Sequence, residues 1–206
     1  MRSFPSWKGQ TNFPGLWWSA TMGRHVGFES WLERDQAMVL DFRRDVVGFS
    51  SQPFWLHWMT EDGPRRHAPD FFARGVDGVV TVIDVRADDR VDAQAEAAFA
   101  AMRAACGQVG WRFERVGALP AAFCRNLRWI SRYRHGRCLG QDGVADRVLA
   151  AFAEVRPLFD GAAEVGDMLA VLPVVYHLLW RQQLMVELNG APLGPATAVQ
   201  VARAAG

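Results

Sequence analysis

Apolar and polar positions alternate with different periods along the chain, and these periods predict its helices and strands. Residues 29–42 carry apolar side chains, among them Leu32, Val39 and Phe42, at the spacing of one helical face. Segments 92–106 and 121–133 also have a helical pattern. Short runs rich in β-branched and aromatic residues predict strands at 46–50, 53–60, 69–74, 79–86 and 111–116. This alternation predicts an α/β fold in which a mixed sheet is flanked by helices.

The composition changes near residues 136–142, and a second pattern follows. It predicts three helices and then two short strands around Asn189-Gly190, at 142–152, 162–169, 172–183, 184–188 and 197–201. Pro173 would lie in the first turn of the third helix, where proline is tolerated. Three helices followed by a hairpin are the order of a winged helix, although any small α+β domain could produce the same order. We therefore expect a first domain at 1–137, with residues 1–25 as an ordered N-terminal arm, and a winged-helix-like domain at 138–206.

Composition adds little to the functional assignment but excludes some classes. The three cysteines form no C-x-x-C pair, so neither a disulfide framework nor a zinc site is expected. We expect the cysteines to be free, buried thiols. No secretory signal is visible, and the longest apolar stretch, at 168–180, is too short to span a bilayer. We expect a soluble, cytoplasmic protein without a membrane partner. The basic residues comprise 22 arginines and one lysine, Lys8.

Candidate chemistry is concentrated in three acidic residues of the first domain. A strand opens at Pro69-Asp70, and an apolar strand runs into Asp84-Val85-Arg86, where period two places Asp84 and Arg86 on one face. Glu33 would arrive from the helix, with Glu29 four residues earlier on the same helical face. An aspartate that ends a core-like strand is costly to bury unless it is paired or binds a metal. The alternative is that these are ordinary surface acids of a sheet.

Three carboxylates at one point would form an all-oxygen site suited to Mg²⁺ or Mn²⁺. Such a site serves phosphodiester hydrolysis, in which metal ions activate water and stabilise the leaving oxygen. A Pro-Asp pair, a spacer and then acid-x-Lys form the core motif of restriction-endonuclease-like enzymes. The sequence has this pattern with arginine in place of lysine.

The wider sequence resembles the TnsA-like transposon endonucleases, in particular the actinobacterial heteromeric transposase endonuclease subunits. The resemblance covers residues 8–135 and extends less specifically to 172–180. Its elements occur in the family's order and spacing and include Gly9-Gln10-Thr11-Asn12-Phe13-Pro14-Gly15, Glu29-Ser30-Trp31-Leu32-Glu33, Ser51-Gln52-Pro53-Phe54, Arg66-His67-Ala68-Pro69-Asp70-Phe71 and Val82-Ile83-Asp84-Val85-Arg86.

The resemblance implies a restriction-endonuclease-like core with Glu33, Asp70, Asp84 and the Val85 carbonyl as ligands of Mg²⁺. It also implies cleavage of double-stranded DNA at the 5′ ends of a mobile element. An integrase-like transposase subunit would process the 3′ ends, and an ATPase regulator usually belongs to such a machine. A nuclease of the same fold that serves defence or repair is a further alternative.

Arg86 departs from the family pattern, because it stands where the catalytic lysine is expected. Arginine cannot act as a base, and its planar group does not imitate an ammonium point charge. It could still stabilise developing charge on phosphate. The chain-wide preference for arginine explains the replacement as compositional drift. The alternative is a catalytically degenerate subunit that keeps the nuclease fold for DNA binding and assembly.

A possible DNA-binding surface follows the core. No Asp or Glu occurs from Arg115 to Gln141, and the predicted helix there carries basic groups at spacings of three and four. The candidates for phosphate contact are Arg125, Arg128, Arg132 and Arg134. The alternative is a solvated helix face paired with acids elsewhere. His67 and Glu29 are expected to support the metal ligands rather than to bind metal.

Overall fold

The computed structural model describes residues 13–202, which form two compact units, 13–118 and 119–202. The boundary lies earlier than the position 137 predicted from composition. The reason is that the segment after Ala118 packs with the C-terminal part of the chain. Along residues 13–202, no helix is both long enough and apolar enough to cross a membrane.

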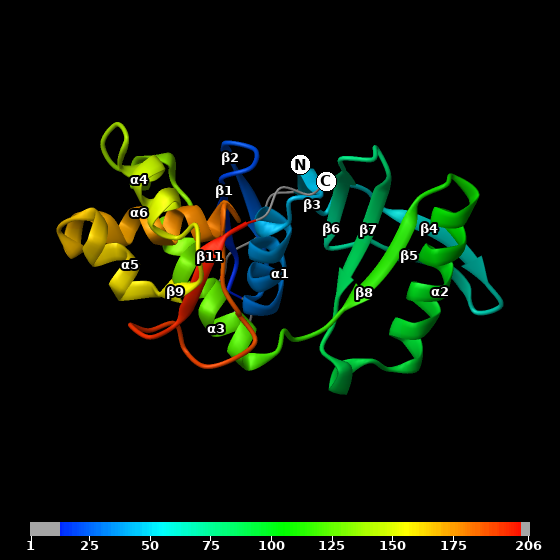
Figure 1. The fold of residues 1–206 in the computed structure, drawn as a ribbon. Helices are drawn as coiled ribbons and strands as arrows, with labels where there is room; N and C mark the ends of the chain where they lie inside the picture. Colours follow the sequence, from blue (N-terminus) through cyan, green and yellow to red (C-terminus); the bar gives the residue numbers. More distant parts are fainter. Residues whose placement is uncertain (1–12, 203–206) are drawn as a thin grey trace. The chain divides into compact units, whose positions relative to one another are not determined.

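A four-stranded mixed sheet forms the centre of the first unit (Figure 1). Its strand order is β3(Val46–Ser51), β6(Phe71–Gly75), β7(Val80–Val85), β8(Arg112–Val116). The pairs β3–β6 and β6–β7 are antiparallel, and the pair β7–β8 is parallel. The parallel pair requires a crossover, and α2(Ala93–Gln108) supplies it, after the short 3₁₀ turn η1(Asp88–Arg90). Strand β7 is buried from Val82 to Asp84 because it is an interior strand of this sheet.

Helix α1(Trp31–Phe42) packs beside the sheet and against the hairpin β1(Gly15–Ser19), β2(Arg24–Phe28). The carboxylate of Asp41, near the C-terminal end of α1, accepts four hydrogen bonds from β1 and the turn after it. The donors are the Trp17 indole at 3.0 Å, the Ser19 hydroxyl at 2.7 Å, and the N–H groups of Ala20 and Thr21 at 3.0 and 2.9 Å. Asp41 is therefore a buried structural acid that fixes the hairpin to α1.

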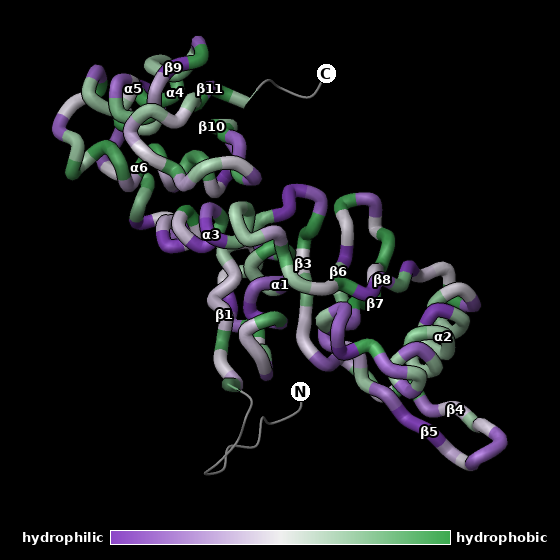
Figure 2. Tube along the Cα trace, turned by 90° about the horizontal axis from the view of Figure 1, so that it is seen from below, coloured by the Kyte–Doolittle hydropathy of each residue, from purple (hydrophilic) through white to green (hydrophobic). Residues whose placement is uncertain are grey.

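A second hairpin, β4(Leu56–Thr60) and β5(Gly63–His67), is inserted between β3 and β6. Phe54 and Leu56 at its base pack against a core cluster that contains Val80, Val82 and Met102. Figure 2 shows the hairpin projecting from the sheet, with β5 mostly hydrophilic. The anchored base fixes the position at which the projecting strands leave the core.

The second unit contains α3, two 3₁₀ turns, three further helices and a small sheet. Its elements are α3(Ala121–Ile130), η2(Ser131–Tyr133), η3(Gly136–Leu139), α4(Val144–Ala151), β9(Arg156–Pro157), α5(Leu158–Val165), α6(Met168–Trp180), β10(Leu184–Met185) and β11(Ala198–Val201). The strand order of the sheet is β10-β11-β9, and all pairs are antiparallel. A Cβ on Gly161 of α5 would lie 2.4 Å from the Phe152 ring, so glycine allows this close approach.

Asn126 ties α3 to the connection between β10 and β11. Its amide donates to the carbonyls of Leu188 and Ala191 at 2.9 Å each, and its oxygen accepts from the N–H of Leu193 at 3.2 Å. This buried side chain explains why α3 belongs to the second unit.

Most predicted elements are present, three predictions were wrong, and one hairpin was not predicted. Helix α1 begins at Trp31, after the N-cap Ser30, so Glu29 lies before the helix. Within the ordered arm predicted at 1–25, the structure has a hairpin at 15–28 that the sequence pattern did not predict, while residues 1–12 of that arm lie outside the described part. The helix expected at 162–169 is Leu158–Val165, because Gly166 leaves the helical conformation with φ +156°. Pro173 lies inside α6 rather than in its first turn.

Candidate functional site

A cavity of about 870 Å³ in the first unit brings most of the predicted site residues together. Its walls come from the N-terminal end of α1, the β4–β5 hairpin, the end of β7 and the first turns of α2. The site residues that line it are Glu33, His67, Asp70, Asp84, Val85 and Arg86. Asp84 and Arg86 line the same cavity, as period two along their strand predicts.

Asp70, directly before β6, and Asp84, in the neighbouring strand β7, lie at the floor of the cavity. Phe71 pairs with Ile83, so the continued antiparallel register places Asp70 opposite Asp84. The N–H of Val85 donates to Oδ2 of Asp70 at 2.7 Å. The side chain of Asp84 is 2% exposed, so its charge has almost no access to bulk water. The sheet register thus brings together two acids that are fourteen residues apart in the sequence.

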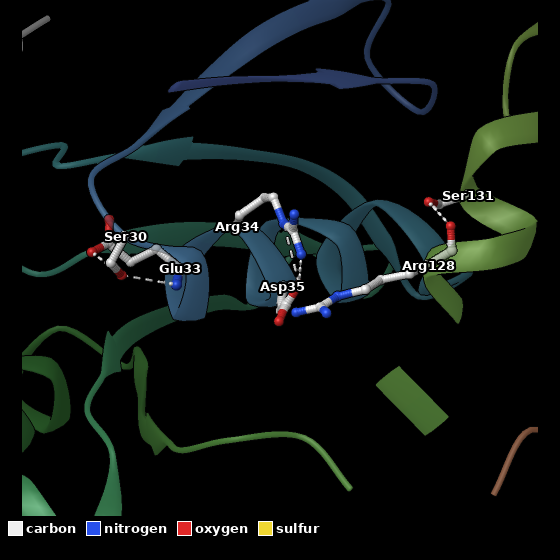
Figure 3. A network of polar contacts seen from close by, with 6 residues as sticks. All are labelled: Ser30, Glu33, Arg34, Asp35, Arg128 and Ser131. Carbon is white, nitrogen blue, oxygen red and sulfur yellow. Dashed lines mark hydrogen bonds and ion pairs between the residues drawn. The ribbon is translucent and has the colours of Figure 1, made fainter. Parts of the chain in front are cut away.

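Glu33 has a structural task that the sequence interpretation overlooked. Ser30 is the N-cap of α1, and its hydroxyl accepts from the N–H of Glu33 at 3.2 Å (Figure 3). The Glu33 carboxylate accepts the N–H of Glu29 at 2.7 Å and the Ser30 hydroxyl at 2.8 Å. This is a variant of the capping box, and the Ser30-x-x-Glu33 spacing was its signal in the sequence. The side chain therefore lines the cavity and stabilises the start of α1.

Burial and mutual repulsion shift two of these acids in the same direction. The pKa of Asp70 is raised well above its ordinary value by burial and then by the negative charge of Glu33, with smaller contributions from Asp84 and Glu29. The pKa of Glu33 is raised as well, mainly by burial, although its hydrogen bonds from Glu29 and Ser30 oppose the shift. A cluster of carboxylates that disfavour their own charge is an environment that a cation would stabilise.

His67 contacts the catalytic candidates directly. Its Nε2 lies 2.8 and 2.9 Å from the two carboxylate oxygens of Asp84. The residue is the last of β5, so the hairpin ends on one of the two floor acids. The expectation that His67 supports a ligand remains a prediction, and the structure identifies Asp84 as its partner.

The donor chemistry suits a hard divalent cation, since Asp70, Asp84, Glu33 and the Val85 carbonyl offer only oxygen. Across residues 13–202, however, no three His, Cys, Asp or Glu side chains are grouped closely enough to hold a metal ion as they stand. The hydrogen bonds give the reason, because Glu33 faces the start of α1 and Asp84 faces His67. Metal binding at this site would therefore exchange these contacts for metal ligation.

Positive charge surrounds the acids. Four arginines line the cavity: Arg65, Arg66, Arg86 and Arg90. Arg86 is exposed, and its backbone carbonyl accepts a hydrogen bond from Arg115 at 3.2 Å, which fixes the chain at the end of β7. The sequence interpretation did not count Arg65 and Arg66 among the site residues, although their position just before Pro69-Asp70 was a signal.

The arginines predicted to bind DNA all lie in the second unit, in or after α3. Arg125, Arg128 and Arg132 are exposed, and the Arg132 guanidinium lies 5.1 Å from the ring centroid of Trp129. Arg134 is half-buried and donates to the Ser131 carbonyl at 2.7 Å. Figure 3 shows the neighbouring contact from the Ser131 hydroxyl to the Arg128 carbonyl. Three of the four arginines thus have the exposure that phosphate contact requires.

Helix α6, which corresponds to the third predicted helix of the winged-helix pattern, is mostly enclosed. Residues 174–180 are all buried. The Nδ1 of His177 donates to the Tyr133 carbonyl at 2.7 Å, and burial lowers the pKa of His177. Of the cysteines, Cys106 is buried and Cys124 and Cys138 are half-buried, and none of the three forms a disulfide within residues 13–202.

No model of a known protein family matches the chain, and no curated protein sequence matches it.

Proposed function

We propose that this protein is a metal-dependent DNA endonuclease that acts as one subunit of a heteromeric transposase. The observation that carries the proposal is that Glu33 of α1, Asp70 directly before β6 and Asp84 of β7 line one cavity together with arginines. Apart from the inserted β4–β5 hairpin, the element order of the sheet and its helices is α1, β3, β6, β7, α2 and β8. That order and the parallel β7–β8 pair agree with a restriction-endonuclease-like core, in which the acids lie at these strand ends.

The second unit supports the winged-helix part of the fold hypothesis. Its order α4, β9, α5, α6, β10, β11, with β11 central in the sheet, agrees with a winged helix. The burial of residues 174–180 favours a structural or protein-binding role for this unit over base reading by α6. An integrase-like transposase subunit is the partner that the sequence resemblance implies, with an ATPase regulator as a further component.

The residues of the cavity divide the chemistry of phosphodiester hydrolysis between them. Asp70, Asp84, Glu33 and the Val85 carbonyl would hold Mg²⁺ or Mn²⁺, which when bound supplies Lewis-acid activation of water and of the phosphoryl group. Arg86, exposed at the end of β7, would neutralise negative charge that develops on the phosphate. His67 would orient Asp84. No side chain here needs to form a covalent intermediate.

Arg86 also favours a second candidate function, that of a subunit which binds DNA without cutting it. An arginine cannot accept a proton from the attacking water, and its planar group does not act as a point charge. The lysine expected there could orient that water as a point charge. The hydrogen bonds that now engage Glu33 and Asp84 point the same way, because metal would have to displace them.

Nicking of supercoiled plasmid in Mg²⁺ or Mn²⁺ tests the two candidates, with wild type, Arg86→Lys and Asp70→Ala compared. Cutting by wild type that Asp70→Ala abolishes supports the endonuclease. An inert wild type together with a gain of cutting in Arg86→Lys supports the degenerate subunit. Cutting that survives Asp70→Ala contradicts the site assignment. An integrase-like transposase gene and an ATPase gene beside the coding gene would favour transposition over defence or repair.

A further inference from the structure

The β4–β5 hairpin forms one wall of the candidate site, and basic and aromatic residues from both of its faces line that wall, with Arg66 on the face opposite Arg65. Trp58, Arg65 and Arg66 all line the cavity. The register pairs Trp58 with Arg65, so these two side chains lie together on one face of the hairpin. His67, two residues after Arg65 and on the same face, contacts Asp84 at the floor.

The two arginines are available to an anionic ligand. The guanidinium carbon of Arg66 lies 4.8 Å from the ring centroid of Trp55, which holds the planar group against an aromatic face while leaving its edge donors accessible. Arg65 forms an exposed pair with Asp62 at 3.5 Å, a weak interaction that a phosphate could replace. No salt bridge of Arg66 is found within residues 13–202.

Charge determines which ligand fits. A floor of carboxylates repels a polyanion, so a nucleic-acid backbone needs cations on either side of the acids to approach them. Arg65 and Arg66 supply them on the hairpin wall, and Arg86 and Arg90 lie at the end of β7 and in η1. The turn of the hairpin carries Glu61 and Asp62, so phosphate contact is expected along the strands rather than at the tip.

We propose that the β4–β5 hairpin is the DNA-holding arm of this site, with Arg65 and Arg66 contacting backbone phosphates of duplex DNA beside the bond at the acidic floor. A two-stranded ribbon has dimensions that fit against duplex DNA. Trp58 provides an apolar wall next to Arg65 for a deoxyribose. The proposal rests on the proposed function, since it takes the cavity as the place where DNA lies.

The test is binding of the full chain to a fluorescent duplex of about 30 base pairs, measured by anisotropy across a salt series in EDTA, so that no cutting occurs. Each phosphate contact contributes about 0.9 to the slope of log K against log salt concentration, so Arg65→Ala/Arg66→Ala should reduce the slope by about 1.8. Between roughly 50 and 200 mM salt, wild type should then lose about tenfold more affinity than the double variant.

Arg103→Ala is the matched control, because the Arg103 guanidinium also stacks on an aromatic ring, 5.4 Å from the centroid of Phe113, but lies outside the cavity lining. It should leave the slope unchanged. Arg65→Lys/Arg66→Lys keeps both charges and should restore most of the slope, which separates lost charge from lost folding.

Three results overturn the inference. Equal slopes for wild type and the double alanine variant, with wild type bound, refute the hairpin arm and leave the proposed function intact. If Arg103→Ala lowers the slope by as much per charge, the effect comes from net charge alone, and the hairpin arm is also refuted. Absence of wild-type binding at about 50 mM salt refutes both the arm and the proposed function. Conversely, a slope that falls as expected while Asp70→Ala retains nicking supports the arm and contradicts the catalytic assignment.

Discussion

Substitutions at Glu33 should separate its role in capping α1 from its proposed role in binding metal. Glu33→Ala removes the acceptor for the Glu29 N–H and the Ser30 hydroxyl, at 2.7 and 2.8 Å. At about 1 kcal/mol for each half-buried hydrogen bond, the free energy of unfolding should fall by about 2 kcal/mol. For a unit of this size the Tm should fall by about 6–8 °C. Glu33→Gln keeps an acceptor and a donor, and glutamine serves in capping boxes, so its cost should stay below about 0.5 kcal/mol.

Glu33→Gln should weaken the stabilisation by metal although it keeps the cap. A metal ion at about one hundred times its Kd stabilises the folded state by about 2.7 kcal/mol. Glu33→Gln removes a charged ligand without removing the cap, and loss of even a supporting group weakens metal affinity about 10–100-fold. The Tm rise with Mg²⁺ or Mn²⁺ should therefore fall to about half of the wild-type rise or less. Ser30→Ala is the control, because it weakens the cap and should keep the full metal response.

Thermal unfolding with and without each metal measures both effects in one experiment. A full metal response in Glu33→Gln would show that Glu33 is a cap and no ligand. A loss of stability in Glu33→Gln as large as that in Glu33→Ala would show that the capping geometry is not what stabilises α1.

Two further substitutions test the charges of the first unit. The folded-state pKa of Asp70 is raised, so the folded state binds its proton more tightly than the unfolded state, and stability should decrease as pH rises from the ordinary aspartate pKa through the raised value. Asp70→Asn should therefore be more stable than wild type by about 1–2 kcal/mol at pH 8, with the difference vanishing near pH 4, as measured by urea unfolding; an unchanged difference across this range would contradict the assignment. Asp41→Asn leaves one amide oxygen for four donors, and two of them, such as those of Trp17 and Ala20, lose their acceptor. Unfolding of the first unit should become easier by about 2–3 kcal/mol, and a cost below 1 kcal/mol would show that the network contributes little.

The sequence contained enough information to predict the central sheet and the position of two acids. Strand β7 has a nearly uninterrupted apolar run before Asp84, and such a run can belong only to a buried strand or helix segment. Period two then placed Arg86 beside Asp84, and both line the cavity. These predictions succeeded because local pattern and burial agree along this strand.

Other features depend on contacts that the sequence pattern does not encode. Strand β5 contains Pro64, Arg65 and Arg66, whose polarity gives no strand signal, and it forms because β4 pairs with it. The contact between His67 and Asp84 depends on where the hairpin leaves the core. The capping role of Glu33 was encoded locally by Ser30, but the catalytic interpretation took precedence over it.

The enclosure of α6 bears on how a DNA target would be chosen. A helix that reads bases must present one face to the major groove, yet every position of α6 from Val174 to Trp180 is covered by its own unit. A change of preferred DNA sequence could therefore not arise by varying these residues, because each variation would disturb packing first. Selection of the target would fall to other elements or to a partner protein, and the same subunit could then serve partners with different target sites.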